Sequence, residues 1–204
     1  MPMCGSYNFS TDNPDEKMSA LISVMERKYP GEYKTGDIFP GDTAPAMIAR
    51  GDKIVPVPAI FGFPGFQDGK LLINARGETA AEKKTFSDSL KEQRVILPAT
   101  GFYEWSSDKT KYLFSVGSSS VLYLCGLYKI IDGKYRFVIL TRQANESMAE
   151  IHDRMPVIVG EDAVRPYLTD LAVAEAIIAT AAQSLTKENK SITPERPKQY
   201  IASV

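Results

Sequence analysis

The stretch that decides the fold is Val121-Leu-Tyr-Leu-Cys-Gly-Leu-Tyr-Lys-Ile130, followed after Ile131-Asp132-Gly133-Lys134 by Tyr135-Arg-Phe-Val-Ile-Leu-Thr141. Both runs are apolar and rich in β-branched and aromatic residues, a composition typical of strands. Asp132-Gly133 between them is a strong signal for a two-residue hairpin turn. The stretch therefore predicts a pair of antiparallel strands.

Extended segments recur on the N-terminal side of this hairpin. Residues 33–69 are rich in Gly and Pro, which suits short strands in an irregular sheet with bulges rather than a parallel α/β sheet. The strands expected before the hairpin cover 46–49, 54–55, 71–73, 94–97 continuing through Pro98 into 101–105, and 112–116.

Helical patterns are few. One helix is expected to begin with Asn13 as N-cap and Pro14 at its first position, and to end at Pro30-Gly31. Further helices are expected from Thr79 to about Leu90, briefly within 141–150, and over 162–168 and 171–182. With no linker or repeat, the chain is predicted to be one α+β domain, a curled and mostly antiparallel, barrel-like sheet with flanking helices.

Composition and net charge limit the classes of function that the chain can have. The 204 residues are 44% hydrophobic and 24% charged, as in an ordinary globular protein. A net charge of −1 argues against coating duplex DNA through bulk charge, although a local basic groove is compatible with it. No apolar run approaches the roughly 20 residues that span a bilayer, and no secretory signal precedes the first strand. We therefore expect no membrane partner and a cytoplasmic location.

Two residues invite a catalytic interpretation. His152 is the only histidine, and Pro156 disfavours the α region for the residue before it, which puts His152 on a turn before an extended run. It either ties that loop to the backbone or transfers protons. Glu104 lies between Tyr103 and Trp105; it either faces solvent or is desolvated, which would raise its pKa and suit general acid work.

Three further residues stand at segment ends. Asn74 is either a turn residue or an oriented amide, and Arg76 either a solvated charge or a phosphate ligand. Cys4 lies near the N-terminus. With one histidine and two cysteines, a metal site is not expected, and neither is a cofactor.

Four motifs together resemble one family, the SOS response-associated peptidase (SRAP) family, in order and spacing. They are Met3-Cys4-Gly5, Asn74-Ala-Arg-Gly-Glu-Thr79, Pro98-Ala-Thr-Gly-Phe-Tyr-Glu-Trp105 and Ile151-His-Asp-Arg-Met-Pro156. The resemblance covers 4–168, and 183–204 forms a polar C-terminal tail. It implies a single SRAP-like domain over 1–204.

The resemblance implies that the protein captures abasic sites in single-stranded DNA as a covalent crosslink through Cys4. The α-amine of an N-terminal cysteine adds to the sugar aldehyde, and the thiol then closes a thiazolidine ring. This chemistry requires removal of residues 1–3 or a translation start at Met3. The family name reflects a proposed self-cleavage before this cysteine, so a peptidase-like reaction is implied as well.

The resemblance also implies residue roles. Asn74 would orient the amine and the sugar, Glu104 would shuttle protons, and His152 would assist the sugar oxygens. The DNA contacts implied are Arg76 on a phosphate, Trp105 in the wall of the site, and Arg154. A monomer is expected, associated with the nucleoid when bound to damaged DNA.

Two departures from the family pattern concern DNA contacts rather than chemistry. Ser6 stands where the family commonly has an arginine, and Phe61-Gly62-Phe63-Pro64 replaces Trp-Gly-Leu-Ile-Pro. Two other functions stay open. A cysteine peptidase acting on proteins would use Cys4, His152 and Asn74. A non-catalytic single-strand DNA-binding module would bind intact and abasic strands equally.

Overall fold

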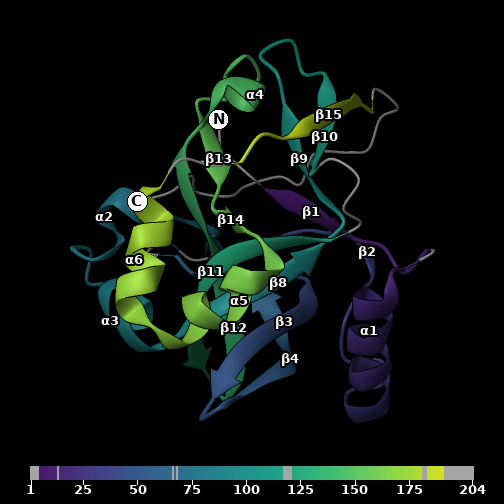
Figure 1. Cartoon of the computed structure of the whole chain (residues 1–204), viewed down its shortest axis with the longest axis vertical. Helices are drawn as coiled ribbons and strands as arrows, with labels where there is room; N and C mark the ends of the chain where they lie inside the picture. Colours follow the sequence, from purple (N-terminus) through teal and green to yellow (C-terminus); the bar gives the residue numbers. More distant parts are fainter. Residues whose placement is uncertain are drawn as a thin grey trace.

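The computed structural model describes residues 5–12, 14–65, 67, 69–116, 121–180 and 183–190 (Figure 1). The strands are β1 Ser6–Phe9, β2 Gly36–Ile38, β3 Thr43–Arg50, β4 Lys53–Phe61, β5 Phe63–Pro64, β6 Leu71–Leu72, β7 Asn74–Arg76, β8 Arg94–Ala99, β9 Gly101–Trp105, β10 Lys111–Ser115, β11 Leu122–Ile131, β12 Lys134–Gln143, β13 Arg154–Pro156, β14 Ile158–Val159 and β15 Thr186–Asn189. The helices are α1 Glu16–Lys28, α2 Gly77–Ala80, α3 Ser87–Glu92, α4 Glu146–Ala149, α5 Glu161–Thr169 and α6 Leu171–Ala179.

The larger sheet closes on itself. Its strand order is β13-β12-β4-β3-β8-β11-β14, and an additional β12–β11 pairing joins the two ends of the central part into a barrel. All of these pairs are antiparallel except β12 with β4, and β7 joins β12 in parallel. The predicted α+β fold with a curled, mostly antiparallel and barrel-like core is confirmed.

The β11–β12 hairpin forms as predicted. Asp132 and Gly133 have φ angles of 51° and 72°, the left-handed values that a type I′ turn requires. The flanking residues Ile131 and Lys134 lie opposite each other. The turn sequence therefore sets the register of the two longest strands.

Strands β3 and β4 are longer than the short pieces expected, although they contain three prolines. Pro45 lies opposite Pro58, and Met47 lies opposite Pro56. Two facing prolines cannot exchange N–H···O bonds, so this pair is a non-hydrogen-bonded one, and the pair two residues away has the same character. The prolines thus fall where the ladder needs no donor, and they do not interrupt it.

A second sheet packs across the barrel, with strand order β15-β10-β9-β1-β2. The single strand expected through Pro98 is in fact two strands in different sheets, because the chain changes sheet between Ala99 and Gly101. One face of this sheet contributes Tyr7, Phe9 and Phe102 to the apolar cluster that also fills the barrel. The described part of the expected C-terminal tail contributes β15, which pairs with β10.

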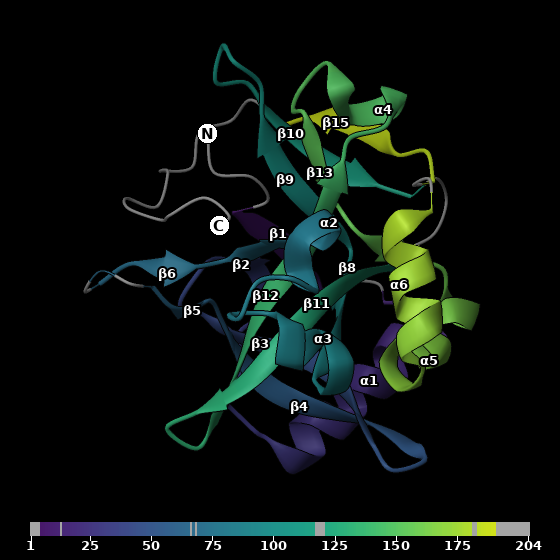
Figure 2. The same cartoon turned by 90° about the vertical axis from the view of Figure 1, so that its left-hand side faces the viewer.

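Helices α3, α5 and α6 lie together on the outside of the barrel (Figure 2). Helix α1 begins later than expected: Asp15 is its N-cap and accepts from the Met18 amide at 2.8 Å, while Asn13 lies outside the described residues. The helix expected from Thr79 is two short ones, α2 and α3, joined by a turn. None of the helices in the described ranges is long and apolar enough to cross a membrane.

Candidate functional site

The end of β12 brings two of the motifs together. Thr141 lies opposite Arg76 of β7 on one side and opposite Pro156 of β13 on the other. The segment that follows Asn74 and the segment that follows His152 are therefore neighbours through one shared strand. In both views, β13 lies at the same end of the molecule as β1 and β9 (Figures 1 and 2).

Asn74 is fully buried, with 0% of its surface exposed. It lies beside Ile139, so its side chain is on the face of the sheet that carries the interior apolar cluster. Neither its amide nitrogen nor its amide oxygen has a hydrogen-bond partner in the structure as described. A buried amide with both groups unpaired costs several kcal/mol by typical values, about 1–3 kcal/mol for each group. Such a group is unusual unless something else binds it.

Glu104 is also buried, with 1% exposed. It shares its face of β9 with Phe102, two residues earlier, which belongs to the interior cluster. Glu104 and Asn74 therefore both point into the layer between the barrel and the second sheet. Of the two expected alternatives for Glu104, burial is the one observed. Tyr103 and Trp105 alternate to the opposite face of β9, so the interior cluster buries Glu104 and these two neighbouring rings do not.

Trp105 is half-buried on that opposite face, where Lys111 lies across from it on β10. The Lys111 ammonium is 3.5 Å from the ring centre of Tyr103 and 5.7 Å from that of Trp105. Asp37 accepts from the Tyr103 hydroxyl at 2.8 Å. Burial lowers the pKa of Lys111, and the nearby Asp37 carboxylate opposes that shift. Sequence reasoning missed this cluster, and a lysine at the start of an apolar strand was the only signal for it.

His152 lies on a turn, as predicted, and its side chain is 11% exposed. Its Nδ1 atom is 3.1 Å from the backbone nitrogen of Arg154 and 2.9 Å from the carboxylate of Asp153. These contacts need different protonation states, since Nδ1 must accept from the first and donate to the second. We favour the contact with Arg154, because the Asp153 side chain is 78% exposed and screened by water. The neutral ring then carries its proton on Nε2.

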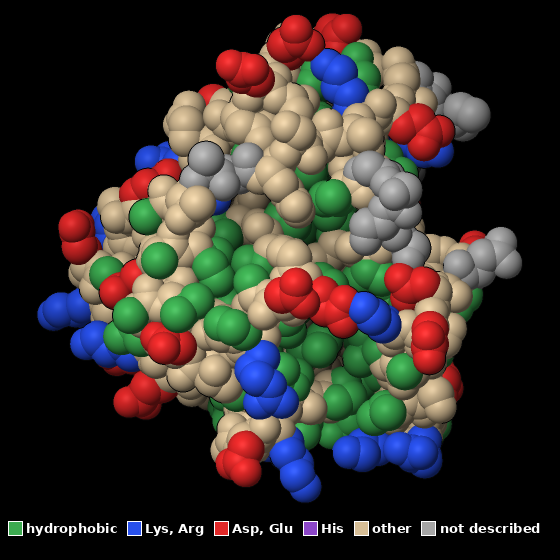
Figure 3. All heavy atoms as spheres, viewed as in Figure 1, with side chains coloured by type: hydrophobic (Ala, Val, Ile, Leu, Met, Phe, Trp, Pro, Cys, Tyr) green, Lys and Arg blue, Asp and Glu red, His purple; other side chains and the backbone are tan. Residues whose placement is uncertain are grey.

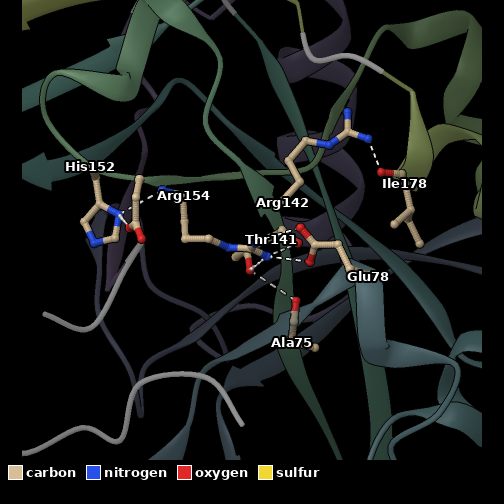
Figure 4. A network of polar contacts seen from close by, with 8 residues as sticks. Ala75, Glu78, Thr141, Arg142, His152, Arg154 and Ile178 are labelled. Atoms are coloured by element: carbon tan, nitrogen blue, oxygen red, sulfur yellow. Dashed lines mark hydrogen bonds and ion pairs between the residues drawn. The ribbon is translucent and has the colours of Figure 1, made fainter.

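Arg154 is held by Glu78 (Figure 4). Its two terminal nitrogens donate to the two carboxylate oxygens at 2.5 and 2.7 Å, and one of them also donates to the Thr141 carbonyl at 2.9 Å. Its Nε atom is buried and has no partner in the described ranges. The Arg154 hydrogen bond is the main reason that the pKa of Glu78 is lowered. The sequence motifs contained Glu78, but nothing in them indicated this pairing.

Two other arginines near the end of β12 differ in role. Arg76 is exposed, and no hydrogen bond or ion pair holds it within the described ranges. Arg142 is buried and donates to the carbonyls of Ile177 and Ile178 at the end of α6, which is a structural role (Figure 4).

Cys4 lies outside the described residues, so the structure does not place it. The other cysteine, Cys125, is 0% exposed, and burial raises the pKa of its thiol well above the ordinary value. It is a small core residue. Within the described ranges, no group of three or more histidine, cysteine or acidic side chains could hold a metal ion.

A groove of about 360 Å³ lies elsewhere, between α1 and the barrel (Figure 3). Its lining is mainly apolar, with Met18, Leu21 and Val164 among its residues, and Lys17 pairs with Glu161 at its edge. None of the candidate site residues that the structure describes lines it.

The fold and the site define an α+β protein in which a barrel and a second sheet enclose a buried carboxamide and a buried carboxylate, next to a histidine-bearing loop. The family described as SOS response associated peptidase (SRAP) matches residues 3–195. The chain belongs to the SRAP family, which confirms the resemblance seen in its motifs.

Two relatives come from Bacillus subtilis. The chain is 38% identical over 172 residues to the abasic site processing protein YoaM, covering 80% of this chain but only 65% of YoaM. It is 39% identical over 182 residues to the abasic site processing protein YobE, covering 81% of this chain and 82% of YobE. A solved structure from Bordetella bronchiseptica has the same fold, with a TM-score of 0.71 at 19% identity over 93% of this chain and all of the other.

Proposed function

We propose that this chain acts on abasic sites in DNA and captures the damaged sugar covalently through Cys4. Membership in a family with relatives named abasic site processing proteins supports the general role in handling such sites. The covalent chemistry is a finer proposal, and it rests on the residues of the site.

The observation that supports the chemistry is the Asn74 amide, which has no hydrogen-bond partner among the residues that the structure describes. A group that both donates and accepts, buried without a partner in the described structure, is suited to a ligand that also has a donor and an acceptor. An amine adding to a sugar aldehyde offers this pair: the amine N–H donates to the amide oxygen, and the sugar oxygen accepts from the amide nitrogen. The cost of leaving Asn74 unpaired is then recovered when the substrate binds.

The sequence provides one candidate nucleophile. Cys125 is enclosed by the core, so a thiol reaction must use Cys4. Cys4 is two residues before Ser6, and Ser6 pairs with Tyr103, the neighbour of Glu104. Two peptide units reach at most about 7.6 Å, which is a short covalent connection to the strand beside Glu104.

The reaction balances without a cofactor or an oxidant. The neutral α-amine of Cys4 adds to the aldehyde of the ring-opened sugar, and the adduct loses water to give an imine. The thiol then adds to the imine carbon: a C–S bond forms, and the thiol proton moves to the nitrogen. Both nucleophiles belong to one residue, so ring closure is intramolecular and favoured.

The other residues fit supporting roles within this proposal. Buried Glu104 would carry the protons that ring opening and water loss require. His152, with Nδ1 occupied by a backbone amide, would present its Nε2 proton to a sugar oxygen. Arg76 would bind a phosphate beside the lesion. Removal of residues 1–3, by self-cleavage or by another protease, supplies the free amine.

The test is intact mass spectrometry of the protein after incubation with a single-stranded abasic oligonucleotide. A chain that begins at Cys4 should give an adduct that survives denaturation without borohydride. Cys4→Ser keeps the amine but lacks the thiol, so it should give an adduct only after borohydride reduction. No adduct with the Cys4-initiated chain would refute the proposal. Undiminished crosslinking by Asn74→Ala, Glu104→Gln and His152→Ala would refute the assigned roles.

A further inference from the structure

The guanidinium group of Arg154 is occupied by the carboxylate of Glu78 in a bidentate pair. Carboxylate and phosphate are the two anions that the planar guanidinium group binds in bidentate fashion. Both carboxylate oxygens of Glu78 are used in this way, at 2.5 and 2.7 Å from the two terminal nitrogens. The side chain of Glu78 is 48% exposed and that of Arg154 only 13%, so Glu78 covers the guanidinium on the solvent side.

We propose that Glu78 is an internal phosphate mimic: it occupies Arg154 in the DNA-free protein, and a phosphate of the bound strand takes its place. This inference rests on the proposed action on DNA. It concerns the competition between Glu78 and DNA, and it makes Glu78 the residue that sets how tightly undamaged DNA is held.

The exchange leaves no buried charge without a partner. The side chain of Glu78 is 48% exposed, so water solvates its carboxylate once it leaves Arg154. Arg154 keeps the Thr141 carbonyl at 2.9 Å. Arg76, two residues before Glu78, is exposed. It provides a second positive charge for the same DNA strand.

The exchange takes place next to His152, which is hydrogen-bonded to the backbone of Arg154. The backbone nitrogen of Arg154 donates to His152 Nδ1, so the residue that would bind the phosphate also fixes the ring orientation of the histidine. Because Arg154 pairs with Gln143 at the end of β12, its backbone stays in place while its side chain changes partner. Phosphate binding therefore exchanges one monoanion for another at Arg154 without moving the loop that carries His152.

The experiment compares Glu78→Gln with Glu161→Gln on an intact single-stranded oligonucleotide. Glu161 pairs with Lys17, is similarly exposed at 51%, and lies at the groove away from the site, so both variants change the net charge equally. Freeing Arg154 should tighten binding by about two- to fivefold beyond the control, the range expected when a partly exposed ion pair no longer competes. The slope of log K against log salt should be the same for both variants, because Arg154 contacts a phosphate in each complex. A slope steeper by about 0.7 for Glu78→Gln would mean that only this variant makes the contact, and would overturn the exchange.

Two further variants keep the result interpretable. Glu78→Ala should show the same gain, and unfolding temperatures establish that both variants fold. Glu78→Gln in an Arg154→Gln background should show no gain. Affinity of Glu78→Gln equal to or below that of Glu161→Gln would mean that Glu78 only holds Arg154 in place, and would overturn the proposal. A wild-type chain starting at Cys4 that forms no abasic adduct would instead overturn the proposed function, and the affinity comparison on intact DNA would still be valid.

Discussion

Asn74→Leu should make the protein more stable while abolishing its reaction. Leucine is close to asparagine in length and has no polar atom, so the substitution removes two buried groups that lack partners in the described structure. At the low end of about 1 kcal/mol each, the relief is about 2 kcal/mol. The change of shape costs up to about 1.5 kcal/mol. We therefore expect the free energy of unfolding to rise by about 0.5–2 kcal/mol.

Urea unfolding measures this directly, provided that the m-value is unchanged. Each kcal/mol should also raise Tm by about 2–4 °C for a chain of this size. The matched control is Thr141→Val, because the Thr141 hydroxyl is a buried polar group that does have a partner, the Ala75 carbonyl at 3.3 Å. It should lose about 0.5–1.5 kcal/mol. A loss of more than about 1 kcal/mol for Asn74→Leu would show that the amide is satisfied in the free protein, and the reasoning would fail.

Three further predictions concern the fold and its charges. Gly133→Ala should lower stability by about 1–2 kcal/mol, because φ is +72° there; an unchanged Tm would contradict the I′ turn. Arg94→Met should cost about 2–4 kcal/mol, since it strips donors from four carbonyls at the ends of α3 and α5; equal stability in urea would show that these carbonyls find other partners. The pKa of Glu78 is lowered by Arg154, so its contribution is present above about pH 4.5 and is lost as pH falls through the folded-state pKa. Glu78→Gln should therefore flatten the acid limb of the stability curve, and an unaltered limb would argue against the pairing.

The parts of the fold that local chemistry specifies were predictable. Asp132-Gly133 set a hairpin, and alternating or continuous apolar runs located most strands. The sheet change at Thr100 was not predictable, because 94–105 is extended throughout and only tertiary pairing shows which half joins which sheet. The length of β3 and β4 was underestimated because a proline in a sequence usually indicates the end of a strand. Only the register shows that these prolines lie where the ladder needs no backbone N–H donor.

The site was predictable as a set of residues rather than as an arrangement. The motifs named Asn74, Glu104 and His152, and the structure shows the first two buried on inward faces. Whether Asn74 and Glu104 are buried depends on which face of each strand points to the interior, and the motifs do not show this. The partnership of Glu78 with Arg154 joins residues of two distant motifs, so no spacing rule along the chain could reveal it. The roles assigned to Arg76, Trp105 and Arg154 in DNA binding stay predictions.

Strand β1 lies inside the second sheet, between β9 and β2. Tyr7 lies opposite Ile38 of β2 on one side and opposite Phe102 of β9 on the other. The first pairing closes a loop of about 30 residues and the second a loop of about 95, and the longer loop costs more entropy to close. The pairing of β1 with β2 is therefore expected to form before β9 completes this sheet, so β1 receives its last partner late in folding.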